Sequence, residues 1–119
     1  MGTSALFTGD MPVEVEEKLI RDAQLGLLKH SGVVLDSTEI LKVGHHGSST
    51  STSEELLSYL NVETAVISCG KDNLYKHPSD EVINRLTKAG VNVYRTDERG
   101  NIIVTMHKDG DYTSTTVNA

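Results

Sequence analysis

Residues 39–48 read EILKVGHHGS: an apolar segment, then a glycine, two adjacent histidines, a second glycine and a serine. The apolar part, residues 39–43, predicts a short buried strand that stops at Gly44. The sequence contains four such strands, each ending in polar residues, after which the chain returns to the same edge of the sheet. The segment therefore indicates both a repeating strand–helix arrangement and a candidate site at the strand ends.

The other three strands are expected at residues 4–8, 64–68 and 91–94. Each ends in or before a short polar segment: TGD at residues 8–10, SCG at residues 68–70 and RTD at residues 95–97. Helices are predicted over residues 12–28, after the capping pattern of residues 52–55, and from Pro78 to the stop signal Gly90. In an α/β sheet with right-handed crossovers, all four strand ends share one edge, where such folds place their ligands.

Two further strands, residues 101–107 and 111–117, are joined through Asp109-Gly110, which favours a β-hairpin. We therefore expect an α/β fold with a mixed sheet of about six strands, three helices and a C-terminal hairpin. The first helix should face the core with a stripe of apolar residues: Val15, Leu19, Ala23 and Leu27, widened by Ile20. Its acidic residues should stabilise its N-terminal end: Glu14, Glu16 and Glu17.

The composition is that of a small globular domain, or of a piece of one. The chain has 119 residues, 37% of them hydrophobic, with one Phe and no Trp, so its core must be aliphatic. The net charge of −6 argues against a general nucleic-acid-binding surface, which is normally basic. No apolar run approaches the length of about 20 residues that a membrane span needs. The abrupt start predicts that residues 1–4 were added for expression or that the chain is cut from a longer one.

Asp10 and the histidine pair are the candidate metal ligands. The Asp10 carboxylate emerges at a strand end beside a glycine, although a turn or helix-capping aspartate has the same pattern. His45 and His46 are adjacent on a strand end and should point in opposite directions, so only one is expected to enter a shared site. A neutral imidazole there suits zinc, manganese or iron, and a solvated or hydrogen-bonded pair is the alternative.

Ser48 and Thr50 lie in a hydroxyl-rich segment that leads into a helix N-terminus, a place receptive to a phosphate or simply a capping loop. His77 precedes another helix and either contacts a ligand or caps the helix. Asp97 either orients a ligand or makes a turn. Cys69, the only cysteine, is interpreted as a small buried hydrophobe.

Four segments taken together resemble the metallo-β-lactamase-like domain of ComEC-type DNA-internalisation competence proteins. They are LFTGD at residues 6–10, LKVGHHGS at 41–48, YKHP at 75–78 and VYRTD at 93–97. The resemblance runs from about residue 5 to about residue 106, with the motifs in the family's order. It implies an αβ/βα sandwich in which each half contributes one sheet, with residues 5–119 as the C-terminal half.

The resemblance also implies roles for individual residues. Asp10 would bridge two metal ions, zinc or manganese, and His45, or else His46, would ligate the second. Ser48, Thr50 and His77 would hold the substrate phosphate, and Ser48 and His77 would also be the catalytic residues. The family's His-x-His-x-Asp-His motif is absent from this sequence. We therefore expect the chain by itself to bind metal weakly and to be inactive.

The function implied is that of a bacterial competence protein for DNA uptake, whose complete domain is a metal-dependent hydrolase, a DNA nuclease. The implied location is a soluble domain of a membrane-anchored protein on the extracytoplasmic side. The expected partners are DNA, the missing N-terminal half, and a second copy bound through an exposed sheet face. Two alternatives stay open: an esterase of the same fold acting on another substrate class, and a non-catalytic module that binds a partner or DNA through its helix N-termini.

Overall fold

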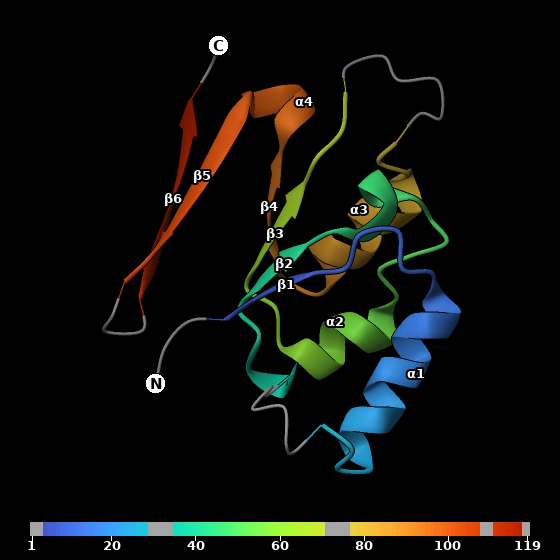
Figure 1. The fold of residues 1–119 in the computed structure, drawn as a ribbon. Coiled ribbons are helices and arrows are strands. Elements are labelled where there is room, and N and C mark those ends of the chain that lie inside the picture. The colour runs from blue at the N-terminus through green and yellow to red at the C-terminus, as the bar shows by residue number, and fades with distance from the viewer. Residues whose placement is uncertain (1–3, 29–34, 71–76, 108–110, 118–119) are drawn as a thin grey trace.

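The computed structural model describes residues 4–28, 35–70, 77–107 and 111–117. Strands and helices alternate along the first part of the chain, and a hairpin follows (Figure 1). The strands are β1 (Ala5–Phe7), β2 (Ile40–Lys42), β3 (Thr64–Ile67), β4 (Asn92–Arg95), β5 (Asn101–Met106) and β6 (Tyr112–Val117). The helices are α1 (Val13–Gln24), α2 (Glu54–Leu60), α3 (Asp80–Lys88) and the single turn α4 (Thr96–Arg99).

The α/β class is confirmed, but the expectation of one mixed sheet of about six strands is wrong. Strands β1 to β4 form a parallel sheet in sequence order, with Leu6, Leu41, Ala65 and Val93 in register across it. Strands β5 and β6 form a separate antiparallel pair. The physical reason is α4, which inserts one helical turn after β4 and redirects the chain before β5 begins.

Helices α1, α2 and α3 lie on one side of the parallel sheet, and the hairpin lies on the other (Figure 1). This placement follows from the strand order, since successive right-handed crossovers in one direction put every helix on the same face. Alternate strand residues, such as Ala65 and Ile67 of β3, face the helices and are fully buried. The core is aliphatic, as the composition predicts: Ile20, Leu35, Leu41, Val43, Leu56, Leu57, Leu60, Val62, Ala65, Ile67, Val82, Leu86 and Val91.

The first helix differs from its prediction in its length and at two residues of its predicted core stripe. It ends at Gln24 rather than near residue 28, because the chain turns at Gly26, whose φ is +77°. Val15 and Leu27, expected on the core stripe, are 44% and 66% exposed. The rest of the predicted stripe is confirmed: Ile20 is buried in the core, and Leu19 and Ala23 pack against it. Glu16, expected only to stabilise the N-terminal end of the helix, is buried as well.

Helix α2 begins directly after the predicted capping pattern of residues 52–55, but its N-cap is Ser53 and not Thr52, the first residue of that pattern. Ser53 and Ser79 are the N-caps of α2 and α3, and each side chain accepts the backbone N–H three residues ahead, a contact typical of N-caps. Helix α3 ends at Lys88, just before Gly90, as predicted. The Asp109-Gly110 turn of the hairpin lies outside the described residues.

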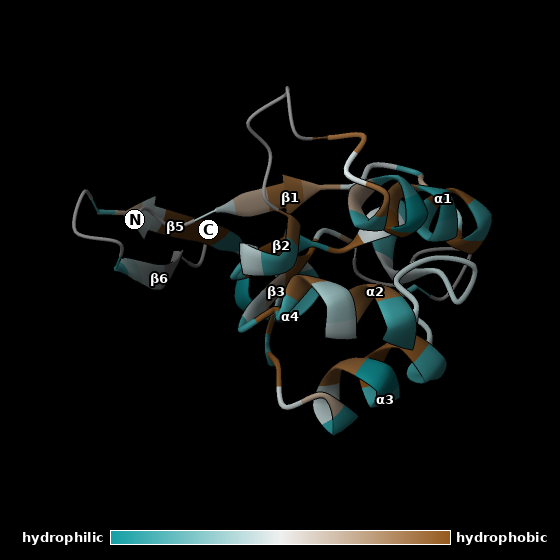
Figure 2. Ribbon diagram, turned by 90° about the horizontal axis from the view of Figure 1, so that it is seen from below, coloured by the Kyte–Doolittle hydropathy of each residue, from teal (hydrophilic) through white to brown (hydrophobic). Residues whose placement is uncertain are grey.

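The face of the sheet opposite the helices is apolar and only partly covered by the hairpin. Between this face and the hairpin lies a cavity of about 230 Å³. We call the surface formed by the residues that line it the apolar face: Ala5, Phe7, Ile40, Lys42, Val66, Ile102, Val104 and Met106. Figure 2 shows β1 and β5 in the colours of hydrophobic residues on this side, with more hydrophilic colours on the helices. The Tyr112 hydroxyl ties the hairpin to the sheet through hydrogen bonds with Thr64 (2.8 Å) and Glu63 (3.1 Å).

None of the helices described is long and apolar enough to span a bilayer.

Candidate functional site

The turns that follow the four parallel strands are bonded to one another in sequence along one edge. The His45 N–H donates to the Gly9 carbonyl at 2.6 Å, which joins the turn after β2 to the turn after β1. His46 Nδ1 lies 2.7 Å from the Ser68 carbonyl, which joins the turn after β2 to the end of β3. Thr96 Oγ1 accepts from the Cys69 N–H and donates to its carbonyl, each at 3.0 Å. The prediction that the strand ends share one edge is confirmed.

The two histidines occupy an unusual backbone conformation. They lie in the turn Gly44–Gly47, here called the histidine turn, and their φ angles are +51° and +53°. Left-handed backbone costs roughly 1–2 kcal/mol for each residue that carries a Cβ. Two such residues in succession mean that surrounding contacts hold this turn in place, a situation common at functional sites.

The two rings contact different parts of the molecule. Because the Ser68 carbonyl only accepts hydrogen bonds, His46 Nδ1 must carry a proton and donate it, which leaves Nε2 as the unprotonated nitrogen of a neutral ring. The His45 ring lies 6.0 Å from the His77 ring, centroid to centroid. Its Nδ1 is 3.4 Å from Thr50 Oγ1, a long contact. His45 rather than His46 is therefore the ring that lies among the predicted phosphate-holding residues.

A short chain of polar side chains leads from Ser48 to His45. Ser48 Oγ and Thr50 Oγ1 lie 2.9 Å apart, and Ser48 Oγ also accepts the Thr50 N–H at 3.3 Å. The structure thus brings together Ser48, Thr50, His45 and His77, four of the six predicted site residues. His46 is directed toward β3. Asp10 follows Gly9, whose carbonyl receives the His45 N–H, and its side chain is exposed.

Residues 77–79, here called the His77 segment, are packed on the histidine turn. The Ser79 N–H donates to the Gly47 carbonyl at 2.9 Å. Gly47 has a φ of +89°, and a Cβ there would lie 2.5 Å from Pro78 Cβ, so only glycine allows this approach. His77 consequently lies beside His45. Tyr75 and Lys76 of the predicted motif lie outside the described residues.

The donors that could ligate a metal form an incomplete set. Among the described residues, no three His, Cys, Asp or Glu side chains come close enough to hold one ion. Divalent zinc or manganese needs four or more ligands. The residues present therefore do not fit a complete metal centre, and any such centre would need further ligands from outside this chain.

Next to this edge, Asp97 pairs with Arg95 rather than facing an open site. The Arg95 guanidinium donates to both Asp97 oxygens, at 3.0 and 2.7 Å. This hydrogen bonding holds the pKa of Asp97 below its usual value, although partial burial opposes the shift. Burial, together with the nearby Asp97, raises the pKa of the Cys69 thiol. Cys69 is therefore poorly suited to act as a nucleophile.

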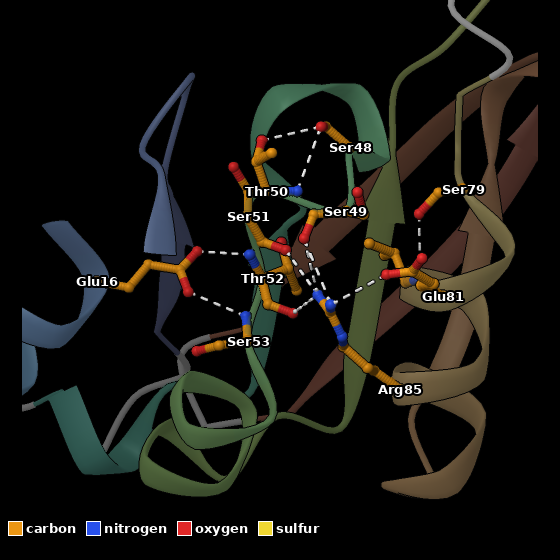
Figure 3. A network of polar contacts seen from close by, with 11 residues as sticks. Glu16, Ser48, Ser49, Thr50, Ser51, Thr52, Ser53, Ser79, Glu81 and Arg85 are labelled. Atoms are coloured by element: carbon orange, nitrogen blue, oxygen red, sulfur yellow. Dashed lines mark hydrogen bonds and ion pairs between the residues drawn. The ribbon is translucent and has the colours of Figure 1, made fainter. Parts of the chain in front are cut away.

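Two residues near the candidate site were missed at the level of sequence. Glu16 from α1 and Arg85 from α3 contact the backbone of residues 48–53, here called the hydroxyl loop (Figure 3). The available signal for Glu16 was its position four residues before Ile20, on the buried side of the helix. Arg85 had no comparable signal, because its position on α3 is typical of a solvated residue.

The site is thus a polar edge of an α/β protein, formed where strand ends, two histidine-bearing turns and a hydroxyl loop meet. Comparison with known proteins finds relatives that match most of the chain, among them the following three. It is 39% identical over 101 residues to ComE operon protein 3 of Bacillus subtilis and 38% identical over 99 residues to competence protein ComA of Neisseria gonorrhoeae. It is 36% identical over 106 residues to recombination protein 2 of Haemophilus influenzae.

These alignments cover 85%, 83% and 89% of this chain but only 12%, 13% and 12% of the relatives. The homologues indicate a competence protein family of the ComEC type, and the chain spans about one eighth of their length. No family model and no solved structure matches the chain.

Proposed function

We propose that this chain is the C-terminal half of a metallo-β-lactamase-like domain in a competence protein, and that the complete domain hydrolyses DNA phosphodiesters. The observation that carries the proposal is the meeting of Ser48, Thr50, His45 and His77 at the edge where the Asp10 turn is also bonded. The relatives named for competence support the DNA-uptake context. The motifs quoted above support the hydrolase class.

In this proposal the chain contributes part of a metal centre and the surface beside it. Asp10 and His45 would supply two ligands, and the remaining ligands would come from a His-x-His-x-Asp-His segment that this sequence lacks. A bound divalent metal polarises a phosphoryl group and lowers the pKa of coordinated water. Ser48 and Thr50 would donate hydrogen bonds to a phosphate oxygen, and His77, whose ring lies 6.0 Å from that of His45, would also hold the phosphate.

The apolar face has a place in the same proposal. Phe7 is 76% exposed there, and Met106 is 49% exposed. Exposed apolar side chains lining one sheet face are typical of an interface. We assign this face to the second sheet of the complete domain, and we place that domain on the extracytoplasmic side of a membrane-anchored protein.

The test uses the complete competence-protein domain that carries this segment, with manganese or zinc and a DNA substrate. Asp10→Asn and His45→Ala should each lower the nuclease rate at least about tenfold, since a lost ligand weakens metal affinity and activity. His107→Ala is the matched control, because His107 is exposed in the hairpin region, and this variant should leave the nuclease rate unchanged. A complete domain that is inactive on DNA with either metal, or an Asp10→Asn variant with full activity, would refute the proposal.

One observation favours a second candidate, a non-catalytic DNA- or partner-binding module: the absent His-x-His-x-Asp-His motif. Such a module would bind DNA with strong salt dependence and without metal. Binding that chelators leave unchanged, together with no hydrolysis, would select this candidate. Hydrolysis of small carboxyl or phosphocholine esters in preference to DNA would instead select an esterase.

A further inference from the structure

The hydroxyl loop, residues 48–53, is held from two sides by charged side chains of opposite sign. Figure 3 shows Glu16 approaching it from α1 and Arg85 approaching it from α3. These two residues contact the backbone of the loop, so they act on its shape whatever its side chains do. The loop in turn carries Ser48 and Thr50 and is continuous with the histidine turn.

Glu16 satisfies the donors of the loop. Its side chain is fully buried, and its two carboxylate oxygens accept the N–H groups of Thr52 (2.5 Å) and Ser53 (2.9 Å). An isosteric glutamine has only one acceptor oxygen, so its NH₂ group would have to face a backbone N–H. A carboxylate is therefore the group that this position requires.

Arg85 satisfies the acceptors of the same loop. Its Nη1 lies 3.1 Å from the Ser51 carbonyl and 3.3 Å from the carbonyls of Ser49 and Thr52. Its other terminal nitrogen contacts the exposed Glu81 at a longer distance of 3.6 Å. The planar guanidinium presents several donors at once, which the single ammonium of lysine cannot match in geometry.

The loop does not fix this shape by itself. Thr52 has a φ of +59°, a strained value for a β-branched residue, and its buried hydroxyl has no hydrogen-bond partner within the part of the chain that the structure describes. The Ser53 side chain is engaged with the Leu56 N–H. Within the loop, the N–H groups of Thr50 and Ser51 donate to the Ser48 hydroxyl and carbonyl, and the Thr50 carbonyl accepts the Val13 N–H at the start of α1. The strained part at Thr52 is held from outside the loop, by Glu16 of α1 and Arg85 of α3.

We propose that Glu16 and Arg85 are positioning residues that clamp the hydroxyl loop and so hold Thr50 against His45. The clamp acts through the backbone at Ser49, Ser51, Thr52 and Ser53, and its effect reaches His45 through Thr50 Oγ1. A role of Glu16 and Arg85 in catalysis rests on the proposed function above. Their effect on the position of the His45 ring is independent of that function.

The test compares Glu16→Gln and Arg85→Gln with the control Glu81→Gln in the 119-residue chain by NMR at one fixed pH. Glu16→Gln should speed amide exchange at Thr52 and Ser53 at least about tenfold, which corresponds to about 1.4 kcal/mol, because these N–H groups lose a carboxylate acceptor. Arg85→Gln should speed the same exchange because the carbonyls that hold the loop lose their donor. Both should also shift the ring nitrogen signals of His45, while those of His107 stay in place. Exchange at Val43, whose N–H donates to the Val66 carbonyl of β3, should be unchanged, which separates local loosening from global destabilisation.

Unchanged His45 signals in both variants would overturn the proposal, even if their melting temperatures fall, because a merely stabilising role predicts that result. A Glu81→Gln variant that shifts His45 as much as Arg85→Gln would overturn it too. In the complete domain, the Glu16→Gln variant should lose nuclease activity in proportion to the His45 shift. If the His45 signals respond but the domain has no nuclease activity, the clamp stands and the proposed function fails.

Discussion

Gly47 and Gly90 both have left-handed φ angles, +89° and +75°, but they differ in what surrounds them. A Cβ on Gly47 would meet Pro78 at 2.5 and 2.8 Å, whereas a Cβ on Gly90 would meet nothing within 4 Å. Gly47 is therefore required by a close approach as well as by its backbone angle. That approach is what brings the His77 segment to the histidine turn.

Gly47→Ala should lower the free energy of unfolding by roughly 2–4 kcal/mol, because it adds overpacking to the backbone penalty. Gly90→Ala should cost only the backbone penalty, roughly 1–2 kcal/mol. Urea unfolding of the two variants measures both values. Equal losses would show that the Pro78 contact carries no energy, and the packing of His77 beside His45 would then need another cause.

The end of β3 is joined to β4 and α4 by side chains rather than by strand pairing alone. Thr96 makes two bonds with the Cys69 backbone, and Asp97 pairs with Arg95 at the start of α4. The Asp97 and Arg95 side chains are 14% and 26% exposed, so solvent screens this pair only partly. The pair therefore stabilises the turn that directs the chain from the sheet to the hairpin.

Asp97→Asn should lower the free energy of unfolding at pH 7 by about 1–2 kcal/mol, because a charged hydrogen-bonded pair is lost. The folded-state pKa of Asp97 lies below its unfolded value near 3.9, so the wild-type contribution is complete above about pH 4. It is lost as the pH falls through the lower, folded pKa. The stability difference between the proteins should therefore shrink in that acidic range, as measured by chemical unfolding at each pH.

In the Asp97→Asn variant, the reactivity of the Cys69 thiol should also change. Asp97 raises the pKa of the thiol, and Arg95 lowers it. Removing the carboxylate charge should increase the thiolate fraction and speed alkylation of the folded protein by iodoacetamide at pH 8. An unchanged alkylation rate would contradict the contact between Cys69 and Asp97.

The molecule as a whole has one face closed by helices and one face left partly open. Three helices bury one side of the parallel sheet, while the hairpin covers only part of the other (Figures 1 and 2). Phe7, on the edge strand β1, stays 76% exposed beside the cavity. Burying its ring against another surface would contribute roughly 1.5–3 kcal/mol.

The 119-residue chain by itself should therefore self-associate through the apolar face. Phe7→Ser should raise the dissociation constant at least about tenfold, since that factor corresponds to only 1.4 kcal/mol. Leu25→Ser is the matched control, because Leu25 is 68% exposed at the end of α1, on the helix side of the sheet. Sedimentation velocity over a range of concentrations measures both variants. A monomeric wild-type chain, or equal effects of the two variants, would contradict this use of the apolar face.

Much of the fold could be predicted because its signals are local. Stop signals such as Gly90 and apolar runs such as residues 64–67 act within a few positions of themselves. The meeting of the strand ends followed from the handedness of crossovers. The predicted stripe on α1 is wrong at Val15, because Val15 and Glu16 are neighbours and only contact with another segment decides which of them is buried.

By itself, the sequence determined the α/β class, the alternation of strands and helices, the hairpin, and the polar residues that gather at one edge. These depend on periodicity, capping and chain handedness, which neighbouring residues specify. Only the tertiary structure decided that Glu16 would be buried beside Thr52, 36 residues away, and that Arg85 would bind the same loop. Only the tertiary structure showed that the hairpin, β5 and β6, forms a sheet separate from β1 to β4. Such contacts join segments with no shared local pattern, and they form because buried N–H and C=O groups must find partners wherever the packed chain supplies them.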